Sequence, residues 1–173
     1  MMKDIDIVAM KIKDIIDDLP SNGNFRTRKL KAINTVVIHH SDSPIGKFSP
    51  VDFANWEMNG KMRAPRICYH YCIEMDGTVY QTNHLDSITW HAGNWNYCSI
   101  GIVLNGDFEE DEPSQEQLNS LRILNYYLQE KFNHKLTVYG HQEVNATLCP
   151  GKNLMKLKDK WVYAVHSRPL DQH

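Results

Sequence analysis

The chain has 173 residues, of which 42% are hydrophobic and 23% are charged. This length suits one well-packed core and is short for two domains. The formal net charge is −2, which excludes the strongly basic surface typical of nucleic-acid-binding proteins, so we expect no nucleic-acid partner.

The first six residues lack the apolar core of a signal peptide and include acids, and no run approaches membrane-spanning length. We therefore expect a protein made without its own export signal and without a membrane partner. Four cysteines occur, and Cys68 and Cys72 are four residues apart on an expected strand. Their Cα atoms would lie roughly 13 Å apart, too far for a disulfide. Reduced thiols and a cytosolic origin fit this pattern.

Apolar residues recur at helical spacing from residue 4 to residue 19, and Pro20 ends the run. The pattern predicts an amphipathic helix that packs on the domain, followed by a loop up to Asn24. Binding to a membrane surface is the alternative for such a helix. Its polar face is mixed and rather acidic, however, whereas membrane-surface helices are usually basic.

The β-branched run from Thr35 to Ile38 predicts a buried central strand that ends with His39 and His40. Neighbouring side chains of a strand face opposite sides, so only one of the two histidines can point at a given site. Periodicity does not choose between them, because the strand is apolar at consecutive positions. Two histidines that merely end a strand are the plain interpretation of this block alone.

Two segments begin with helix-capping patterns, Ser49 with Asp52 and Ser114 with Gln117. The first also has a proline at its first helical position. The expected helices run to about residues 59 and 133, and a third runs from about 154 to 165.

Asp76-Gly77 joins two short runs and predicts a tight hairpin in which both central residues take positive φ. Strands and helices alternate along the chain, and no linker rich in Gly, Ser or Pro separates a second module. The predicted fold class is therefore α/β, in a single domain. The expected strands after residue 68 cover residues 69–75, 78–81, 99–105 and 136–139.

A histidine and a cysteine near the end of the chain form a candidate zinc site. His141 and Cys149 have seven residues between them, and Pro150-Gly151 can end a turn that brings both side chains to one point. Neutral imidazole and thiolate bind zinc well, and a histidine from the distant strand can complete a set of three ligands. Three protein ligands leave a fourth position for water, which indicates a catalytic metal.

Six short motifs follow one another over about residues 33–155, and the set is far more specific than any single motif. They are Val36-Val37-Ile38-His39-His40-Ser41, Tyr69-His70-Tyr71, Asp76-Gly77-Thr78-Val79-Tyr80, Trp90-His91-Ala92-Gly93, Ser99-Ile100-Gly101-Ile102 and the block from His141 to Gly151. In these motifs the chain resembles the zinc-dependent N-acetylmuramoyl-L-alanine amidases of the second amidase family. That family includes amidase-type phage lysozymes and peptidoglycan recognition proteins.

The resemblance implies a central mixed β-sheet flanked by helices. The expected division is an N-terminal segment of residues 1–24, a zinc amidase domain of residues 25–166 and a loose tail of residues 167–173. The resemblance also assigns the Zn²⁺ ligands as His39, His141 and Cys149, because family members place the ligand first in the histidine pair.

The resemblance also assigns catalytic roles. Tyr69 matches the family tyrosine near the metal, whose phenol can donate a hydrogen bond to the water or the oxyanion. Thr147 stands where phage lysozymes have lysine and many recognition proteins have threonine, and it cannot act as an ammonium acid. Glu143 is expected to orient His141 or to shuttle protons.

Substrate contacts are expected from His91, Trp90 and Trp95, because His91 matches a family histidine at the groove and indole faces pack well on sugar rings. The alternative is that both tryptophans are core anchors. The basic loop of residues 61–67 is expected either to contact acidic groups of a wall peptide or to be a solvated loop.

The implied reaction cleaves the amide between the lactyl group of N-acetylmuramic acid and the first L-alanine of the stem peptide. Peptidoglycan is then the partner, the protein is expected to be a monomer, and the setting is a phage or prophage endolysin that acts on the wall after release. Two alternatives stay open: a module that binds peptidoglycan without hydrolysis, and a thiol peptidase with Cys149 as nucleophile and His141 as base.

Overall fold

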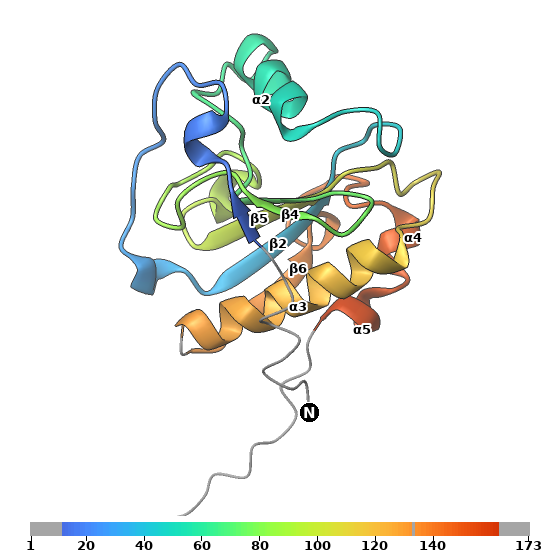
Figure 1. The fold of residues 1–173 in the computed structure, drawn as a ribbon. Coiled ribbons are helices and arrows are strands. Elements are labelled where there is room, and N and C mark those ends of the chain that lie inside the picture. The colour runs from blue at the N-terminus through green and yellow to red at the C-terminus, as the bar shows by residue number, and fades with distance from the viewer. Residues whose placement is uncertain (1–11, 133, 163–173) are drawn as a thin grey trace, which may run out of the picture.

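The computed structural model describes residues 12–132 and 134–162 (Figure 1). This part of the chain forms a six-stranded sheet with strand order β1-β4-β3-β5-β2-β6. The β3 and β4 pair is antiparallel and the other pairs are parallel, so the sheet is mixed, as predicted. The strands are β1 (Ile12–Asp14), β2 (Thr35–His40), β3 (Tyr71–Ile73), β4 (Val79–Gln81), β5 (Ser99–Leu104) and β6 (Thr137–Gly140).

The two capping patterns start helices where the sequence predicts them. Ser49 Oγ accepts from the Asp52 backbone N–H and an Asp52 carboxylate oxygen accepts from the Ser49 N–H at 2.8 Å. Ser114 and Gln117 make the same reciprocal pair at 3.0 and 3.1 Å. Within the described residues, no helix is long and apolar enough to cross a membrane. The α-helices are α2 (Pro50–Asn59), α3 (Gln115–Phe132), α4 (Lys152–Met155) and α5 (Lys158–Trp161).

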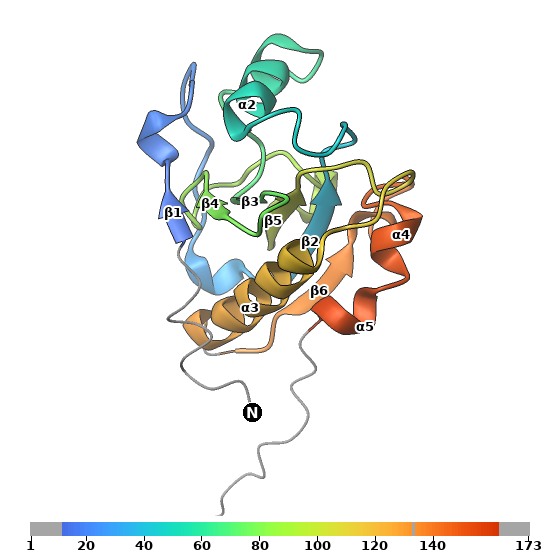
Figure 2. The same ribbon diagram turned by 45° about the vertical axis from the view of Figure 1, so that its right-hand side comes forward.

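Helices cover both faces of the sheet (Figure 2). On one face, α3 and α5 pack on a core that includes Ile38, Ile102, Leu124 and Trp161, each fully buried. On the other face, α2 covers a smaller core that includes Phe53. The central strands are therefore buried on both sides, which explains why their sequences read as continuous apolar runs.

The side chains of β2 alternate between these two layers. Val36 and Ile38 belong to the core under α3, and His40 follows on that face, where its Nδ1 accepts a hydrogen bond from the Phe108 N–H at 3.1 Å. His39 points to the opposite face, toward the side that α2 covers. The structure thus separates the two histidines that sequence periodicity leaves equivalent.

The N-terminal helix predicted for residues 4–19 is wrong over residues 12–19, and residues 1–11 lie outside the described part. Residues 12–14 instead form β1, which pairs with the open edge of β4, and residues 16–18 form a 3-10 helix. The apolar spacing is still used for burial, because Ile16 and Leu19 are only 3% and 6% exposed. Backbone pairing with a distant strand replaces the local helix.

The last helix is interrupted, and its predicted residues 163–165 lie outside the described part. The carbonyl of Leu154, which a continuous helix would bond to the Lys158 N–H, accepts from the Leu157 N–H and from the Trp161 indole at 3.0 Å. The chain therefore forms α4 and α5 separately. The domain boundaries at residues 24 and 166 stay predictions, and the tail of residues 167–173 also lies outside the described part.

The hairpin between β3 and β4 is confirmed, but its turn differs from the prediction. Gly77 has a φ of +81°, whereas Asp76 is not among the described residues with positive φ. The Gly77 N–H donates to the Glu74 carbonyl at 2.9 Å, so Met75 and Asp76 form the centre of the turn. Glycine alone supplies the left-handed residue.

We expect Leu124→Ala to lower the free energy of unfolding by about 2–5 kcal/mol, because Leu124 is fully buried between α3 and the sheet. Urea unfolding followed by circular dichroism measures this change. Leu30→Ala is the matched control, since Leu30 is 47% exposed. Equal losses in the two variants would contradict the assigned core.

Candidate metal centre

The parallel register of β2 and β6 brings two histidines together. Ile38 of β2 pairs with Gly140 of β6, so the next residue of each strand, His39 and His141, emerges at the same edge of the sheet. Their ring centroids lie 4.4 Å apart. The neighbouring residues 141–143 form a 3-10 helix that begins the loop leading to the cysteine.

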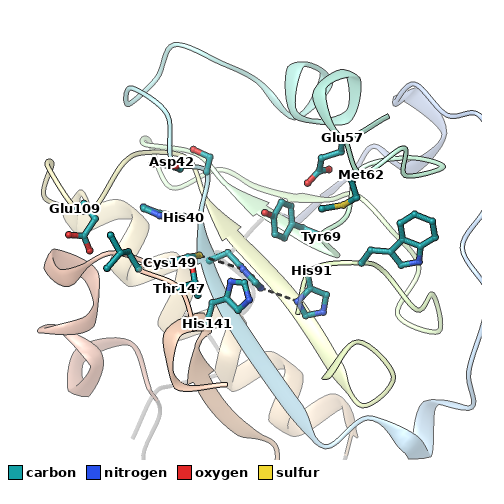
Figure 3. Close-up of a pocket in the computed structure, with 14 residues that line it drawn as sticks. His40, Asp42, Glu57, Met62, Tyr69, His91, Glu109, His141, Thr147 and Cys149 are labelled. Carbon is teal, nitrogen blue, oxygen red and sulfur yellow. Dashed lines mark hydrogen bonds between the residues drawn. The ribbon is translucent and has the colours of Figure 1, made fainter. Parts of the chain in front are cut away.

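The loop after His141 returns to the same point. The Gln142 N–H donates to the Cys149 carbonyl at 2.7 Å, which closes the loop, and the Cys149 sulfur lies 3.6 Å from His39 Nδ1. The candidate ligand atoms of His39, His141 and Cys149 all lie within 4.8 Å of one another. The structure thus brings together the three predicted metal ligands in the lining of a cavity of about 360 Å³ (Figure 3).

The donor set fits a zinc ion. Burial, then the proximity of His91 and His141, lowers the pKa of His39 well below its usual value, and burial lowers the pKa of His141. Both imidazoles are therefore neutral, as metal binding requires. Burial raises the pKa of the Cys149 thiol to about 12, so a metal ion must displace its proton on binding. Two imidazoles and one thiolate form a set typical of zinc with an open position.

Tyr69 lines the same cavity, and its ring centroid lies 5.1 Å from that of His39. Burial, followed by the nearby carboxyl group of Glu57, raises the pKa of its phenol well above the usual range. The phenol therefore keeps its proton and can act as a hydrogen-bond donor. Thr147 also lines the cavity, but its Oγ1 accepts from the Cys149 backbone N–H at 3.2 Å, which makes it a support for the ligand loop.

His91 is buried behind His39. Its Nδ1 lies 3.0 Å from His39 Nε2 and its Nε2 lies 3.2 Å from Ser99 Oγ, as Figure 3 shows for the first of these bonds. Both ring nitrogens are engaged within the protein. His91 contributes to the cavity lining, yet its two ring nitrogens contact His39 and Ser99.

The two predicted substrate-binding tryptophans lie in different places. Trp90 is 44% exposed, lines the cavity and packs edge-on against Phe25 with centroids 5.6 Å apart. Trp95 is not among the described cavity-lining residues and packs against Tyr139 instead, with centroids 5.8 Å apart. Only Trp90 is placed as a wall for a ligand.

Glu143 lies outside the described lining of the cavity. Its carboxylate accepts from the Gly140 N–H at 2.7 Å and pairs with Lys158, so it holds the turn that begins with His141. This geometry fits the predicted orienting role of Glu143, and these two contacts direct its carboxylate to the turn, not to the cavity, where proton transfer would occur.

The basic loop of residues 61–67 divides into two parts. Lys61 and Arg63 are exposed, whereas Arg66 is buried and donates to the Ile16 carbonyl at 2.5 Å. Met62, between the two exposed bases, lines the cavity. Arg66 therefore fixes the segment around Ile16 on the domain, whereas Lys61 and Arg63 are exposed beside the cavity-lining Met62 without being among the described lining residues.

Among the carboxyl groups at the cavity that sequence reasoning did not identify, the one with a raised pKa is Glu57 of α2. Its Oε2 accepts from the backbone N–H of Cys68, the residue before Tyr69, at 2.7 Å. Figure 3 shows the side chains of Glu57 and Tyr69 at the cavity. Burial raises its pKa from 4.5 to about 7, against the opposing effect of that hydrogen bond. The available signal was its spacing, because Glu57 follows Phe53 by four residues and so places an acid on the apolar face of the helix.

These features define a single α/β domain with a His-His-Cys cluster at the carboxyl edge of its sheet. Residues 29–152 match the protein family described as N-acetylmuramoyl-L-alanine amidase, so the chain belongs to this family. The match confirms the resemblance found in the six motifs.

Solved structures of two kinds share the fold. The endolysin N-acetylmuramoyl-L-alanine amidase LysCS from Clostridium intestinale URNW has a TM-score of 0.71 at 27% identity, covering 87% of this chain and 94% of that one. A chain from the complex of peptidoglycan recognition proteins LCa and LCx with tracheal cytotoxin has a TM-score of 0.78 at 25% identity, covering 88% and 96%.

Curated sequences give a similar picture. Peptidoglycan-recognition protein SD of Drosophila simulans is 32% identical over 109 residues, which are 62% of this chain and 58% of that protein. The chain spans from 50% to 60% of the length of such curated relatives.

The raised pKa of Glu57 predicts a pH-dependent stability. Because the pKa is about 7 in the folded protein and about 4.5 in the unfolded chain, folding takes up a proton between these values. The contribution of Glu57 to the free energy of unfolding is therefore fully present below about pH 4.5. It is lost as the pH rises through about 7, and the loss is at most about 3 kcal/mol.

Urea unfolding of the metal-free protein between pH 4.5 and pH 8 measures this effect. Glu57→Gln keeps an acceptor for the Cys68 N–H and removes the titration, so the variant gains stability relative to the wild type as the pH rises. A difference between the two proteins that stays constant with pH would contradict the buried position of this carboxyl group.

Proposed function

We propose that this protein is a zinc-dependent N-acetylmuramoyl-L-alanine amidase that hydrolyses the amide between N-acetylmuramic acid and L-alanine in peptidoglycan. The observation that carries the proposal is the convergence of His39, His141 and Cys149 beside the protonated phenol of Tyr69 in one cavity. Membership of the amidase family supports the reaction type, and the names of the structural relatives support the substrate.

The proposed cofactor supplies two kinds of chemistry when bound: zinc lowers the pKa of a water ligand toward neutrality and polarises a carbonyl group. The protein supplies the contact to the oxyanion. Tyr69 donates its phenolic proton in a hydrogen bond to the oxygen that becomes negative as water adds to the amide carbon. Thr147 carries no charge and cannot act as an ammonium acid toward the leaving amine, so its role is limited to hydrogen bonding, as in the bond that its Oγ1 accepts from the Cys149 N–H.

The cavity rim favours a ligand with both sugar and peptide character. Three large apolar side chains at the cavity are exposed, namely Met62, Trp90 and Leu148, with 49%, 44% and 71% exposure. Aromatic and aliphatic faces of this kind pack on sugar rings and on short peptide side chains while tolerating water. We propose that Trp90 contacts the sugar.

We further propose that the protein is an endolysin that acts as a monomer on the wall of the cell that produces it. The similarity to the endolysin LysCS supports this setting. Fractionation of producing cells tests it: the protein should reach the wall only once the membrane is breached. Recovery from the wall of intact cells without any lysis partner would count against it.

The decisive experiment is digestion of purified peptidoglycan by the zinc-loaded protein. We expect new alanine amino termini, which disappear with a chelator and return with zinc, and no new reducing sugar ends. Termini that persist with chelator but vanish on alkylation would instead support a thiol peptidase. Tight peptidoglycan binding without new termini would support a recognition module.

Tyr69→Phe should lower kcat by about 10²- to 10³-fold, because removal of one oxyanion donor has effects of this size. Zinc content should not change, since the phenol is not a ligand. Tyr71→Phe is the matched control, because Tyr71 lies two residues away in the core under α3. Wild-type turnover by Tyr69→Phe would exclude the catalytic role.

A further inference from the structure

Two of the six motifs meet behind the metal ligand. The motif of residues 90–93 contains His91, and the motif of residues 99–102 contains Ser99 and Gly101. Their side chains form a chain of hydrogen bonds that ends on His39: 3.0 Å from His39 Nε2 to His91 Nδ1, 3.2 Å from His91 Nε2 to Ser99 Oγ, and 2.7 Å from Ser99 Oγ to the Trp95 carbonyl.

The far end of this chain fixes the direction of every proton in it. A carbonyl oxygen can only accept, so the single hydroxyl proton of Ser99 points at Trp95. Ser99 Oγ must then accept from His91, which places the imidazole proton of His91 on Nε2. His91 Nδ1 is left as an acceptor, so it receives the proton on Nε2 of His39. The remaining nitrogen, His39 Nδ1, keeps its lone pair.

That lone pair faces the other candidate ligands. His39 Nδ1 is the atom 3.6 Å from the Cys149 sulfur, on the cavity side of the ring. A histidine can bind a metal only through an unprotonated nitrogen, and the tautomer is set by the bond that the other nitrogen makes. The reversed proton order would put hydrogen on Nδ1 and block the site.

The side chain of His91, which accepts the proton from His39, is also fixed in position. Gly101 of β5 faces the His91 ring so closely that a Cβ at this position would lie 2.7 Å from His91 Cγ. The loop that carries His91 is held by Asn96, whose side-chain oxygen accepts from the N–H groups of His91 and Ala92 at 3.1 and 2.6 Å. Only glycine at position 101 therefore leaves room for the imidazole of His91.

We propose that Ser99 and His91 are positioning residues that hold His39 in the tautomer with Nδ1 free for the metal. His91 acts through His39, and this replaces the substrate-binding role expected for His91. The inference rests on the zinc site of the proposed function but not on cleavage of peptidoglycan.

The tautomer can be observed without metal or substrate. Long-range ¹H–¹⁵N NMR correlations of the ¹⁵N-labelled, metal-free protein at pH 7.5 should show a proton on Nε2 and none on Nδ1 for His39, and the same for His91. A proton on Nδ1 of His39 would overturn the proposal.

Zinc affinity provides the second readout, by competition with a chromophoric chelator. Ser99→Ala and His91→Leu should each weaken zinc binding by about 10- to 100-fold, the range typical for loss of a partner behind a metal-bound histidine. His91→Asn should recover part of this loss, because its side-chain oxygen can accept from His39 Nε2. Cys149→Ser removes a proposed ligand, so its effect shows how far zinc affinity falls when a ligand itself is lost.

Ser120→Ala is the matched control, because Ser120 also donates to a backbone carbonyl, that of Gly77, but lies on α3 away from the cavity. It should leave zinc affinity unchanged. Wild-type affinity in folded Ser99→Ala would refute the role of the serine, and His91→Asn no better than His91→Leu would refute the hydrogen-bond mechanism.

If a variant does not fold, the NMR result on the wild type still decides the tautomer. Failure of the proposed function can be distinguished from failure of this inference. A protein that shows the expected tautomer and zinc affinity but releases no alanine termini retains the positioning role of Ser99 and His91 and lacks amidase activity.

Discussion

The parallel alignment of β2 with β6 is the constraint on which the candidate site depends. Because Ile38 pairs with Gly140, the residues that follow each pair emerge side by side at the carboxyl edge of the sheet, where open α/β sheets usually bind ligands. Two candidate ligands from positions about a hundred residues apart are thereby placed by backbone hydrogen bonds. Only the third candidate ligand, Cys149, depends on a loop, and that loop is closed by the bond from the Gln142 N–H to the Cys149 carbonyl.

The burial of β2 on both faces gives His39 two different environments. One ring nitrogen faces the cavity and the other faces a neutral hydrogen-bonded support inside the protein. The floor of the site is therefore buried and hydrogen-bonded, whereas the rim, with Trp90 and Leu148, is exposed. A protein built in this way can change its ligand preference at the rim without disturbing the metal ligands.

The parts of the fold that local chemistry determines could be predicted from the sequence. The capping pairs at Ser49 and Ser114 start α2 and α3 as expected, because both partners lie within one helical turn. The segment at residues 12–19 could not be predicted, because its helical spacing is also satisfied by an edge strand and a 3-10 turn. Pairing with β4 decides between them.

The same division applies to the site. The motif set located the three candidate metal ligands and Tyr69, but periodicity could not separate His39 from His40, since both faces of β2 are covered. Nor could it reveal that both nitrogens of His91 are used inside the protein.

The absence of a side chain at Gly101 has a further consequence, because it makes room for the imidazole of His91. We therefore expect positions 91, 99 and 101 to vary together among relatives, because a β-carbon at position 101 would displace the imidazole of His91 and leave Ser99 without this partner.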